Sequence, residues 1–482
     1  MKLSHLLGDW FTHEDVDCDI LDLQNDSRKV KAGDLFFAYP GSNQDGRLFI
    51  DKALTAGAAA IAYDPCELSS PPLLSVPTVS IPQLAGKLAK IANRFYNNPS
   101  SFLQVTGITG TNGKTTIAYQ LAQAHHLLGT KSAYIGTIGQ GEVNQLQELS
   151  NTTPDALCLM KLLHDYKNRN IQQVCMEVSS HALSQNRVDA IEFDQAVFTN
   201  LTQDHLDYHK SMQAYGAAKA LLFVRPELKF AILNQDDPFT TAIANQLNPG
   251  VKKITYGMHD PCDVQAVEWT MDVQGTTIGV QSPWGRHQLR IGSLGLFNIY
   301  NSLALFSSLL LSDYPPEDVV QIMSQLKAAP GRMEVVLHTP YVLVDYAHTP
   351  DALEKALSTL SDLKKGQLWV VFGCGGDRDK TKRPLMGRAA SIYADHILIT
   401  SDNPRNEDPK RIIDEIATGI PKGIHVNKIM DREEAIAYAL EHAEKDDIVL
   451  IAGKGHESYQ QIGQVKHPFS DQEVIRRLVS RA

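Results

Sequence analysis

The chain has 482 residues, enough for about three domains of ordinary size. Apolar residues make up 43% of it and charged residues 21%, which excludes a collagen-like, coiled-coil or wholly disordered chain. The 55 acidic residues outnumber the 45 basic ones, and the formal net charge of −10 disfavours binding to nucleic acid or to an anionic membrane. We therefore expect a folded protein in which any anionic ligand meets a local cationic site.

Cysteine usage and hydropathy indicate the compartment. The six cysteines are dispersed and form no C-x-x-C pair, which favours a reducing environment. Acidic residues interrupt the first turns of the chain, unlike the apolar core of a signal peptide. The longest apolar stretch, around 303–311, contains two serines and is too short to span a bilayer. These features predict a cytoplasmic protein without membrane insertion.

Two loop-forming stretches, 97–101 (NNPSS) and 328–332 (AAPGR), divide the chain into three predicted α/β segments. The segments are 1–98, 99–331 and 332–482. The middle one opens with a strand, a glycine-rich turn and a helix, which is the β-turn-α unit of a nucleotide-binding fold. The region 269–295 is β-rich. The other expected strands are 34–38, 102–105, 174–178, 196–199, 368–372, 396–400 and 448–451, and the expected helices include 51–56, 84–94 and a helix after 114.

The glycine-rich turn at 107–116 reads GITGTNGKTT. Between a strand and a helix, such a turn lets backbone N–H groups and the helix N-terminus cradle phosphate. Lys114 can reach the β and γ oxygens, and Thr115 can hold Mg²⁺, so ATP is the expected ligand. Five residues, not the usual four, separate Gly107 from Gly113. The alternative is a turn that only caps a helix. The expected ATP-binding residues here are Gly110, Thr111, Asn112, Gly113, Lys114, Thr115 and Thr116.

Three further residues are candidates for chemistry at the ends of the following elements. Glu177 ends a predicted strand, where a carboxylate can hold magnesium, or can equally be a cap or surface charge. His205 lies in the polar run DHLDYH and is a candidate metal ligand, or an exposed loop histidine. Lys219 lies in a helical stretch with few charges, so burial would depress its pKa and favour the neutral amine; the alternative is a lysine that extends to solvent.

Eight motifs, found in order along all three segments, resemble the Mur ligase family of peptidoglycan synthesis. Among the types in this family the resemblance is closest to the MurE type, which adds the third residue to UDP-N-acetylmuramoyl-L-alanyl-D-glutamate. The motifs are GTNGKTT (110–116), EVSSH (177–181), DHLDYH (204–209), GRMEV (331–335), DYAHTPDAL (345–353), GCGGDRDKTKRPLMG (373–387), DNPR (402–405) and GKGHE (453–457).

The resemblance implies an architecture of three α/β domains. A small domain, 1–98, would bind the UDP group. A central P-loop ATPase domain would span 99–331, and a C-terminal Rossmann-like domain, 332–482, would bind the incoming amino acid. The resemblance also implies that Lys219 is carbamylated and helps Thr115, Glu177 and His205 to hold Mg²⁺. Lys114, Glu177, His205 and Lys219 would be the catalytic residues, in a monomeric enzyme.

The family pattern also places substrate contacts on matching positions. Further ATP contacts would be Asn298, Arg332, Asp345 and His348. Contacts to the UDP-linked substrate would be Ser27, Asn151, Thr152, Thr153, Ser179, Gln185 and Arg187, whose hydroxyls, amides and guanidinium suit a pyrophosphate-bearing ligand.

The DNPR motif predicts which amino acid is added. Arg405 offers a planar donor pair for a carboxylate, and meso-diaminopimelate carries a distal carboxylate that lysine lacks. The resemblance therefore implies a diaminopimelate-adding enzyme, with Glu457 meeting the distal ammonium. The expected binding residues are Arg378, Asp402, Asn403, Pro404, Arg405, Gly453 and Glu457.

The implied reaction is ATP-dependent formation of an amide through an acyl phosphate, with release of ADP and phosphate. One alternative is a folylpolyglutamate synthetase, which shares a similar phosphate loop, although DNPR and the long first segment argue against it. A regulatory or motor ATPase is a second. A dinucleotide-dependent oxidoreductase is a third, but the glycines at 373–376 do not have the G-x-G-x-x-G spacing.

Overall fold

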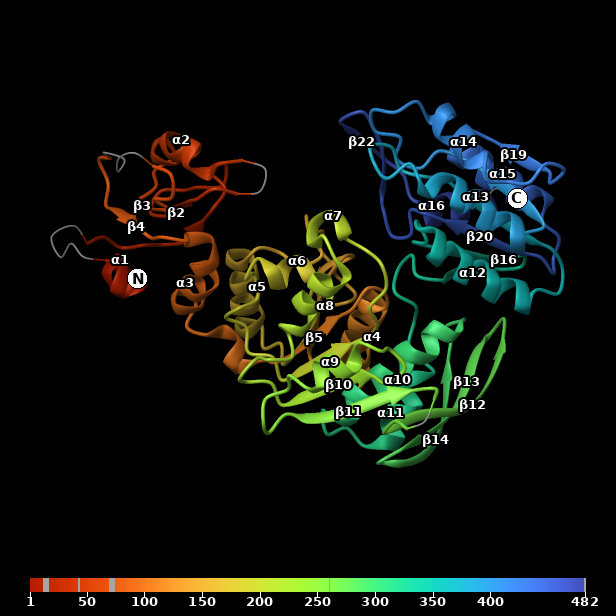
Figure 1. Ribbon diagram of the computed structural model, residues 1–482, viewed down its shortest axis with the longest axis horizontal. Helices are drawn as coiled ribbons and strands as arrows, with labels where there is room; N and C mark the ends of the chain where they lie inside the picture. Colours follow the sequence, from red (N-terminus) through yellow and green to blue (C-terminus); the bar gives the residue numbers. More distant parts are fainter. Residues whose placement is uncertain (12–16, 42–43, 69–73, 260, 481–482) are drawn as a thin grey trace. The chain divides into compact units, whose positions relative to one another are not determined.

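The computed structural model describes residues 1–11, 17–41, 44–68, 74–259 and 261–480 (Figure 1). The chain divides into two compact units. The first comprises Met1–Tyr256 with Ser307–Ser312, and the second comprises Gly257–Phe306 with Asp313–Ala482. The division falls inside the predicted middle segment, and each unit is described by itself.

The N-terminal part of the first unit is a small parallel sheet with short helices. The strands lie in the order β1-β2-β3-β4, and β2 and β3 are buried throughout because they are made of apolar residues. The elements are β1 (Leu23–Gln24), β2 (Leu35–Ala38), β3 (Ala60–Tyr63), β4 (Thr78–Ser80), α1 (Leu3–Leu7), α2 (Ile50–Thr55) and α3 (Leu88–Phe95).

The rest of the first unit is built on a larger, mostly parallel sheet in the order β11-β10-β9-β5-β8-β6-β7. Central β5 is hydrogen-bonded to β8 on one side and β9 on the other, so their carboxyl ends share one edge of the sheet. Only β7 is antiparallel to its neighbour. The strands are β5 (Gln104–Thr109), β6 (Ser132–Gly136), β7 (Gly139–Gly141), β8 (Gln173–Glu177), β9 (Gln195–Phe198), β10 (Phe230–Asn234) and β11 (Lys252–Gly257).

Helices pack against this sheet (Figure 1), and α4 and α8 carry the candidate residues Lys114, Thr115, Thr116 and Lys219. Helix α4 begins directly after the glycine-rich turn and packs against β6 and β8. The helices are α4 (Lys114–Leu127), α5 (Ala156–Asn168), α6 (Ser180–Ser184), α7 (Leu206–His209), α8 (Met212–Ala220) and α9 (Thr240–Ala244).

The second unit contains an antiparallel meander and a six-stranded sheet. The meander is β12 (Val264–Asp272), β13 (Gly275–Ser282) and β14 (Gly285–Ile291), followed by α10 (Leu296–Leu310) and α11 (Pro316–Met323). The six-stranded sheet has the order β15-β16-β20-β17-β18-β19, and all its strands are parallel except β15. A hairpin of β21 (Tyr459–Ile462) and β22 (Val465–Pro468) follows β20.

The six-stranded sheet is buried on both faces because its strands are continuous apolar runs. In β17 the side chains of Leu368, Val370 and Phe372 enter one core, while Trp369 and Val371 enter the other. The elements are β15 (Glu334–His338), β16 (Tyr341–Asp345), β17 (Leu368–Phe372), β18 (His396–Ile399), β19 (Val426–Lys428), β20 (Ile448–Ala452), α12 (Pro350–Leu363), α13 (Lys382–Tyr393), α14 (Pro409–Ala417), α15 (Arg432–His442) and α16 (Asp471–Val479).

The expected elements are confirmed, with one boundary that was wrong. The strand predicted at 102–105 begins only at Gln104, because Pro99–Phe102 forms a 3-10 turn, and it continues to Thr109. Proline fixes a backbone angle that suits the first turn of a helix, which explains why the strand does not begin at Phe102. The β-rich region expected at 269–295 overlaps the meander, which begins at Val264 and ends at Ile291.

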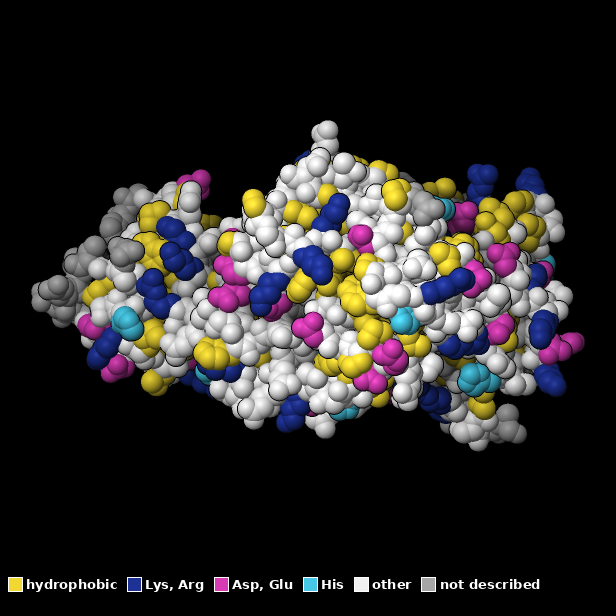
Figure 2. All heavy atoms as spheres, turned by 90° about the horizontal axis from the view of Figure 1, so that it is seen from below, with side chains coloured by type: hydrophobic (Ala, Val, Ile, Leu, Met, Phe, Trp, Pro, Cys, Tyr) yellow, Lys and Arg dark blue, Asp and Glu magenta, His cyan; other side chains and the backbone are white. Residues whose placement is uncertain are grey.

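The surface carries charged side chains of both signs. On the face drawn in Figure 2, acidic and basic side chains are interspersed, and the described residues there form no field of a single sign. Within the described part of the chain, every helix is too short or too polar to cross a bilayer.

A buried ion pair joins the first turns of α15 and α16. The guanidinium of Arg432 donates to both carboxylate oxygens of Asp471 at 2.8 Å, and both side chains are 0% exposed. We expect Arg432→Met to lower the free energy of unfolding by about 3–5 kcal/mol, because it leaves a carboxylate buried without its cation. Urea unfolding followed by circular dichroism measures this change.

The exposed pair of Lys428 and Asp414 provides the control, because Lys428→Met should cost no more than about 1 kcal/mol. The double variant Arg432→Met/Asp471→Asn should be more stable than Arg432→Met alone, since neither charge is then buried. Equal stability of Arg432→Met and the parent would contradict this assignment.

Candidate functional site

The glycine-rich turn connects the carboxyl end of β5 to the first turn of α4, as the sequence predicts. Gly110 and Gly113 have φ angles of 148° and 89°, which glycine adopts readily. A Cβ atom on Gly110 would lie 1.8 Å from Oγ1 of Thr199, so glycine is required where the turn approaches the end of β9. Nζ of Lys114 donates to the carbonyl oxygens of Gly110 and Thr111 at 2.9 and 2.8 Å. The backbone of the turn and the N-terminus of α4 form a phosphate-binding geometry.

The residues after β9 hold the turn in place. Asn200 accepts the N–H of Thr111 through its backbone oxygen at 2.8 Å, and that of Asn112 through Oδ1 at 3.0 Å. The hydroxyl of Thr199 donates to the backbone oxygen of Asn112 at 2.6 Å. A segment nearly 90 residues further along the chain therefore fixes the shape of the phosphate loop.

Lys219 is buried against the same turn. It comes from α8, is 1% exposed, and its Nζ donates to the backbone oxygen of Gly110 at 2.7 Å. Burial, with a contribution from the positive charge of Lys114, holds the pKa of Lys219 well below its usual value. Of the two alternatives that the sequence leaves open for Lys219, the neutral buried amine is therefore favoured over a lysine that extends to solvent.

The buried amine of Lys219 should make the free energy of unfolding depend on pH. Between the lowered pKa and the unfolded value near 10.4, the unfolded chain binds one more proton at Lys219 than the folded chain. The free energy of unfolding then rises with pH by up to about 1.4 kcal/mol per unit. We expect the stability difference between the parent and Lys219→Met to shift in favour of the parent from about pH 7 to pH 9. Urea titrations in carbonate-free buffer measure it, and parallel curves would contradict it.

Glu177 is the last residue of β8, and both of its carboxylate oxygens accept hydrogen bonds. Oε1 accepts from the hydroxyl of Tyr134 at 2.5 Å and from the N–H of Thr137 at 2.8 Å, and Oε2 accepts from the hydroxyl of Thr115 at 3.0 Å. The side chain is almost fully buried. Carboxylate and hydroxyl oxygens are the ligands that Mg²⁺ prefers, so the Thr115–Glu177 pair fits that ion.

His205 lies among aromatic rings at the start of α7. Its ring centroid is 4.9 Å from that of His181 and 6.1 Å from that of Tyr215, while Asp204 lies 3.5 Å from Nε2. Burial, together with His205 and His209, lowers the pKa of His181 and favours a neutral ring. Among the described residues, no three His, Cys, Asp or Glu side chains are grouped so as to hold a metal ion.

The residues expected to contact the UDP-linked substrate in the larger sheet lie together. Arg187 donates to the backbone oxygen of Thr153 at 2.8 Å and, through Nε, to Oε1 of Gln185 at 3.0 Å. The hydroxyl of Thr153 accepts the N–H of Ser179 at 3.0 Å. Thr152 is 3.1 Å from the hydroxyl of Thr137, and Asn151 precedes it in the same loop.

Ser27 lies in the turn that follows β1 of the small N-terminal sheet. It lines a cavity of about 520 Å³ together with Arg28, Tyr39 and Lys52. Asn25, in the same lining, donates to the hydroxyl of Tyr39 at 3.2 Å. Aromatic, amide and cationic groups in one cavity provide both a stacking surface and polar contacts.

The second unit holds the other four residues expected to contact ATP. Asn298 lies in the first turn of α10 and donates to the backbone oxygen of Leu294 at 2.8 Å. The guanidinium of Arg332 lies 4.4 Å from the ring centroid of Tyr346. Asp345 accepts the N–H of Met333 at 2.7 Å, and Nδ1 of His348 is 2.9 Å from the backbone oxygen of Tyr346. The loop after β16 therefore has a defined conformation.

The DNPR loop follows β18 and is clamped by the β21 strand. Asp402, Asn403 and Pro404 are buried, and Arg405 adopts a φ of 50°. Gln461 of β21 accepts the N–H of Arg405 at 3.1 Å, and Nη1 of Arg405 donates to the backbone oxygen of Gly376 at 2.7 Å. A Cβ on Gly375 would lie 3.0 Å from Nη1 of Arg405 and 3.7 Å from Cγ of Arg378. The two arginines expected to bind the acceptor thus lie against one glycine.

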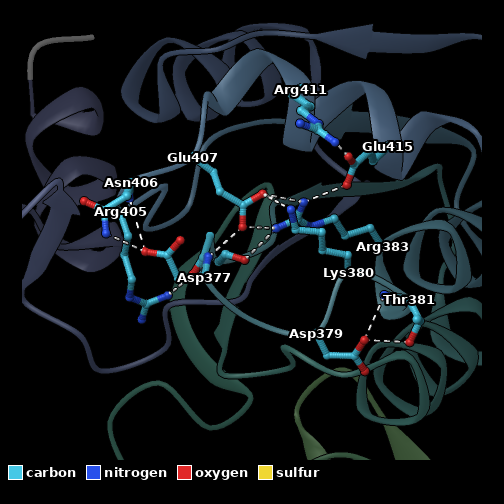
Figure 3. Close-up of polar contacts among 12 residues, drawn as sticks. Asp377, Asp379, Lys380, Thr381, Arg383, Arg405, Asn406, Glu407, Arg411 and Glu415 are labelled. Atoms are coloured by element: carbon cyan, nitrogen blue, oxygen red, sulfur yellow. Dashed lines mark hydrogen bonds and ion pairs between the residues drawn. The ribbon is translucent and has the colours of Figure 1, made fainter.

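Figure 3 shows the ion pairs that join this loop to α13 and α14. Arg383 is fully buried and donates to both carboxylate oxygens of Glu407 at 3.0 Å and to Glu415 at 2.6 Å. This partner lowers the pKa of Glu407 to about 2. Glu407 in turn accepts the N–H of Asp377 at 2.7 Å, so the loops that carry Arg378 and Arg405 are tied together.

Sequence reasoning missed the residues that orient the candidates. Tyr134 and Thr137 hold Glu177 but come from a different strand and turn, and no sequence signal pairs them with it. Lys454 contacts both Asn403 and Glu457. Its position beside Gly453 in the GKGHE motif could have identified it as a candidate from the sequence.

The fold and the phosphate loop define an α/β nucleotide-binding protein of the P-loop class. Three family models match the chain in order: the Mur ligase family catalytic domain at 20–96, the Mur ligase middle domain at 108–309 and the Mur ligase glutamate ligase domain at 331–455. With the full-length relatives described next, they show that the chain belongs to the Mur ligase family and has its three-domain α/β architecture.

Several curated relatives are similar over almost the whole chain. The UDP-N-acetylmuramoyl-L-alanyl-D-glutamate–2,6-diaminopimelate ligase of Neisseria meningitidis is 44% identical and covers 94% of this chain and 93% of its own. The enzyme of the same name from Pseudomonas aeruginosa is 44% identical and covers 98% of both. A solved structure of a ligase with this name is 36% identical, with a TM-score of 0.71 over 96% of this chain and 95% of that one.

More distant structures share the fold alone. The MurF ligase of Thermotoga maritima, solved with ADP, is 20% identical with a TM-score of 0.67. A folylpolyglutamate synthase of Mycobacterium tuberculosis is 15% identical with a TM-score of 0.63 and covers 76% of this chain. The fold alone therefore does not distinguish a Mur ligase from a folylpolyglutamate synthase. The similar phosphate loops lead to the same expectation.

Proposed function

We propose that the chain is an ATP-dependent ligase that adds meso-diaminopimelate to UDP-N-acetylmuramoyl-L-alanyl-D-glutamate during peptidoglycan precursor synthesis. The observation that carries the proposal is similarity to ligases of this name over 94–98% of the chain. ATP would phosphorylate the D-glutamyl carboxylate to an acyl phosphate and leave as ADP. The free amine of the acceptor would then attack the acyl carbon, and phosphate would depart as the amide forms.

In the first step, the phosphate loop would bind the nucleotide. The incoming carboxylate and the γ-phosphate repel each other by about 4 kcal/mol at 4 Å for unit charges in an effective dielectric of 20. The ammonium of Lys114 can offset this repulsion once it exchanges its backbone contacts for phosphate oxygens. Arg187, Gln185 and Thr153 would hold the UDP-linked substrate, supported by their mutual hydrogen bonds.

The metal in this proposal is Mg²⁺, held by Thr115 and Glu177 with His205 and a carbamate on Lys219. When bound, it would neutralise charge on the phosphate oxygens. Tyr134 and Thr137 would orient the Glu177 carboxylate, because both donate to its Oε1.

Carbamylation of Lys219 is supported by its burial and by the lowered pKa, since the neutral amine is the form that reacts with carbon dioxide. Enzyme incubated with ¹³C-bicarbonate should show one carbamate carbonyl resonance that is missing from Lys219→Met. The same spectrum for parent and variant would exclude this modification.

In the second step, the loops around β18 and β20 would hold the acceptor. Arg405 and Arg378 supply cations for the distal carboxylate, and Asp402 and Glu457 supply anions for ammonium groups. The arrangement suits a doubly zwitterionic amino acid better than one with a single carboxylate. Asn298, Arg332, Asp345 and His348 are the further residues proposed to contact ATP.

One assay tests the proposal. Phosphate release is followed with ATP, Mg²⁺ and the UDP-linked dipeptide, with meso-diaminopimelate, lysine or no amine added. We expect rapid release and a tripeptide product with diaminopimelate, and much slower release with lysine. Release that is independent of any amine would indicate a regulatory or motor ATPase, and product formation with a folate and glutamate would indicate a folylpolyglutamate synthetase.

Two further inferences concern the compartment in which the protein acts, and its oligomeric state and domains. We infer action in the cytoplasm, where ATP and nucleotide-linked precursors meet, and six free cysteines are consistent with a reducing compartment. We also infer a monomer with domains at 1–98, 99–331 and 332–482. Size-exclusion chromatography with light scattering measures the mass, and limited proteolysis locates the boundaries.

A further inference from the structure

Two lysines are buried among the described residues, Lys219 and Lys454. The proposed mechanism uses only Lys219. Lys454 follows Gly453 at the end of β20 in the second unit, and its side chain is 0% exposed. A buried ammonium is costly unless it is paired and hydrogen-bonded, so its contacts show what it does.

The ammonium of Lys454 joins two residues that are expected to bind the acceptor amino acid. Its Nζ donates to Oδ1 of Asn403 at 3.2 Å and to Oε2 of Glu457 at 3.1 Å. Nδ2 of Asn403 also donates to Oε2 of Glu457, at 2.8 Å. Lysine, amide and carboxylate therefore form a closed triangle between the loop after β18 and the loop after β20.

The triangle fixes both acceptor-binding side chains. Oδ1 of Asn403 accepts from Lys454 and also from the N–H of Gln461 at 2.8 Å, so the amide has one orientation. Both contacts to Glu457 use Oε2, and its side chain is 19% exposed. Oε1 of Glu457 is not used in the triangle and is the oxygen that can meet an ammonium group.

We propose that Lys454 is a positioning residue for the acceptor: its ammonium fixes the Asn403 amide and orients Glu457 so that one carboxylate oxygen faces the distal ammonium of diaminopimelate. This inference rests on the proposed function. Because the lysine acts through Glu457 and Asn403, its loss should weaken binding of the acceptor and leave the ATP-dependent first step intact.

The experiment compares the steady-state kinetics of the parent, Lys454→Met, Lys454→Gln, Glu457→Gln and Lys454→Met/Glu457→Gln. For Lys454→Met we expect the KM for diaminopimelate to rise about 10- to 100-fold, as for loss of a charged hydrogen bond. The KM values for ATP and for the UDP-linked dipeptide should stay within about twofold. Lys454→Gln, whose amide can still donate, should lie between parent and Lys454→Met. The control is Lys466→Met on the adjacent hairpin, an exposed lysine over the Tyr459 ring, which should match the parent.

The double variant tests whether Lys454 works through Glu457. Its rise in KM for diaminopimelate should be smaller than the product of the two single rises, because the lysine then has no carboxylate left to orient and acts only through Asn403. Additive effects, an unchanged acceptor KM, or an equal rise in all three KM values would overturn the inference. So would unfolding of both lysine variants, which would make Lys454 a folding residue. A parent that forms no product with diaminopimelate would overturn the proposed function itself, and a functional parent with unaffected variants would overturn only the role of Lys454.

Discussion

Lys114→Met should lower kcat for ligation by about 10³-fold or more. The ammonium lies at the start of α4 and, in the proposed mechanism, would be the cation that the phosphate loop provides for the γ-phosphate. Methionine keeps the length of the side chain and removes its charge, so repulsion between phosphate and carboxylate is no longer offset. Product formation followed by chromatography of the UDP-linked tripeptide measures the loss.

Lys131→Met is the matched control, because Lys131 is an exposed lysine between α4 and β6. It should retain the kcat of the parent. A Lys114→Met enzyme with nearly full kcat would show that the loop does not act on a transferring phosphate, and the ATP-dependent mechanism would then be wrong.

Arg405→Ala should reduce kcat/KM with meso-diaminopimelate by about 30-fold to several thousand-fold, equivalent to about 2–5 kcal/mol for the loss of one partner of a buried charge pair. The left-handed backbone of Arg405 and its bond to Gly376 aim the guanidinium, and alanine would leave the distal carboxylate of the acceptor with only one of its two proposed cations, Arg378. Initial rates at varied acceptor concentration measure the effect.

Lysine as acceptor supplies the internal control for this variant. It has no distal carboxylate, so whatever rate the parent shows with lysine should be unaffected by Arg405→Ala. If the variant used diaminopimelate as well as the parent does, Arg405 would not be the determinant of acceptor choice. Arg405→Lys should recover part of the rate, since it restores charge but not the planar pair of donors.

Most of the fold could be predicted from local sequence. Leu368–Phe372 forms a strand with the predicted bounds, because five consecutive apolar residues between Gln367 and Gly373 suit a strand buried on both faces. The start of β5 was wrong by two residues, because the proline-led turn before it competes with the strand. The ends of helices and strands depend on such local competition, so they are predicted from sequence less accurately than their interiors.

The candidate residues were predictable where chemistry depends on short spacing. The residues of each motif, the phosphate loop, DNPR and GKGHE, are close together in the sequence. Each motif can therefore be recognised from the sequence alone. The supporting contacts were not predictable, because they join distant positions. Tyr134 to Glu177 spans 43 residues, and Lys454 to Asn403 spans 51.

The sequence by itself determined the α/β class, the phosphate loop and the chemical character of the acceptor loop, because side-chain type and spacing decide these locally. Only the tertiary structure decided which groups are deprived of water and which partners orient them. Lys219 shows the difference: its helix was evident from the sequence, but the pKa of its amine depends on burial against Gly110, a residue 109 positions earlier in the chain. Burial is a property of the assembled sheet and helices, so no local pattern could assign it.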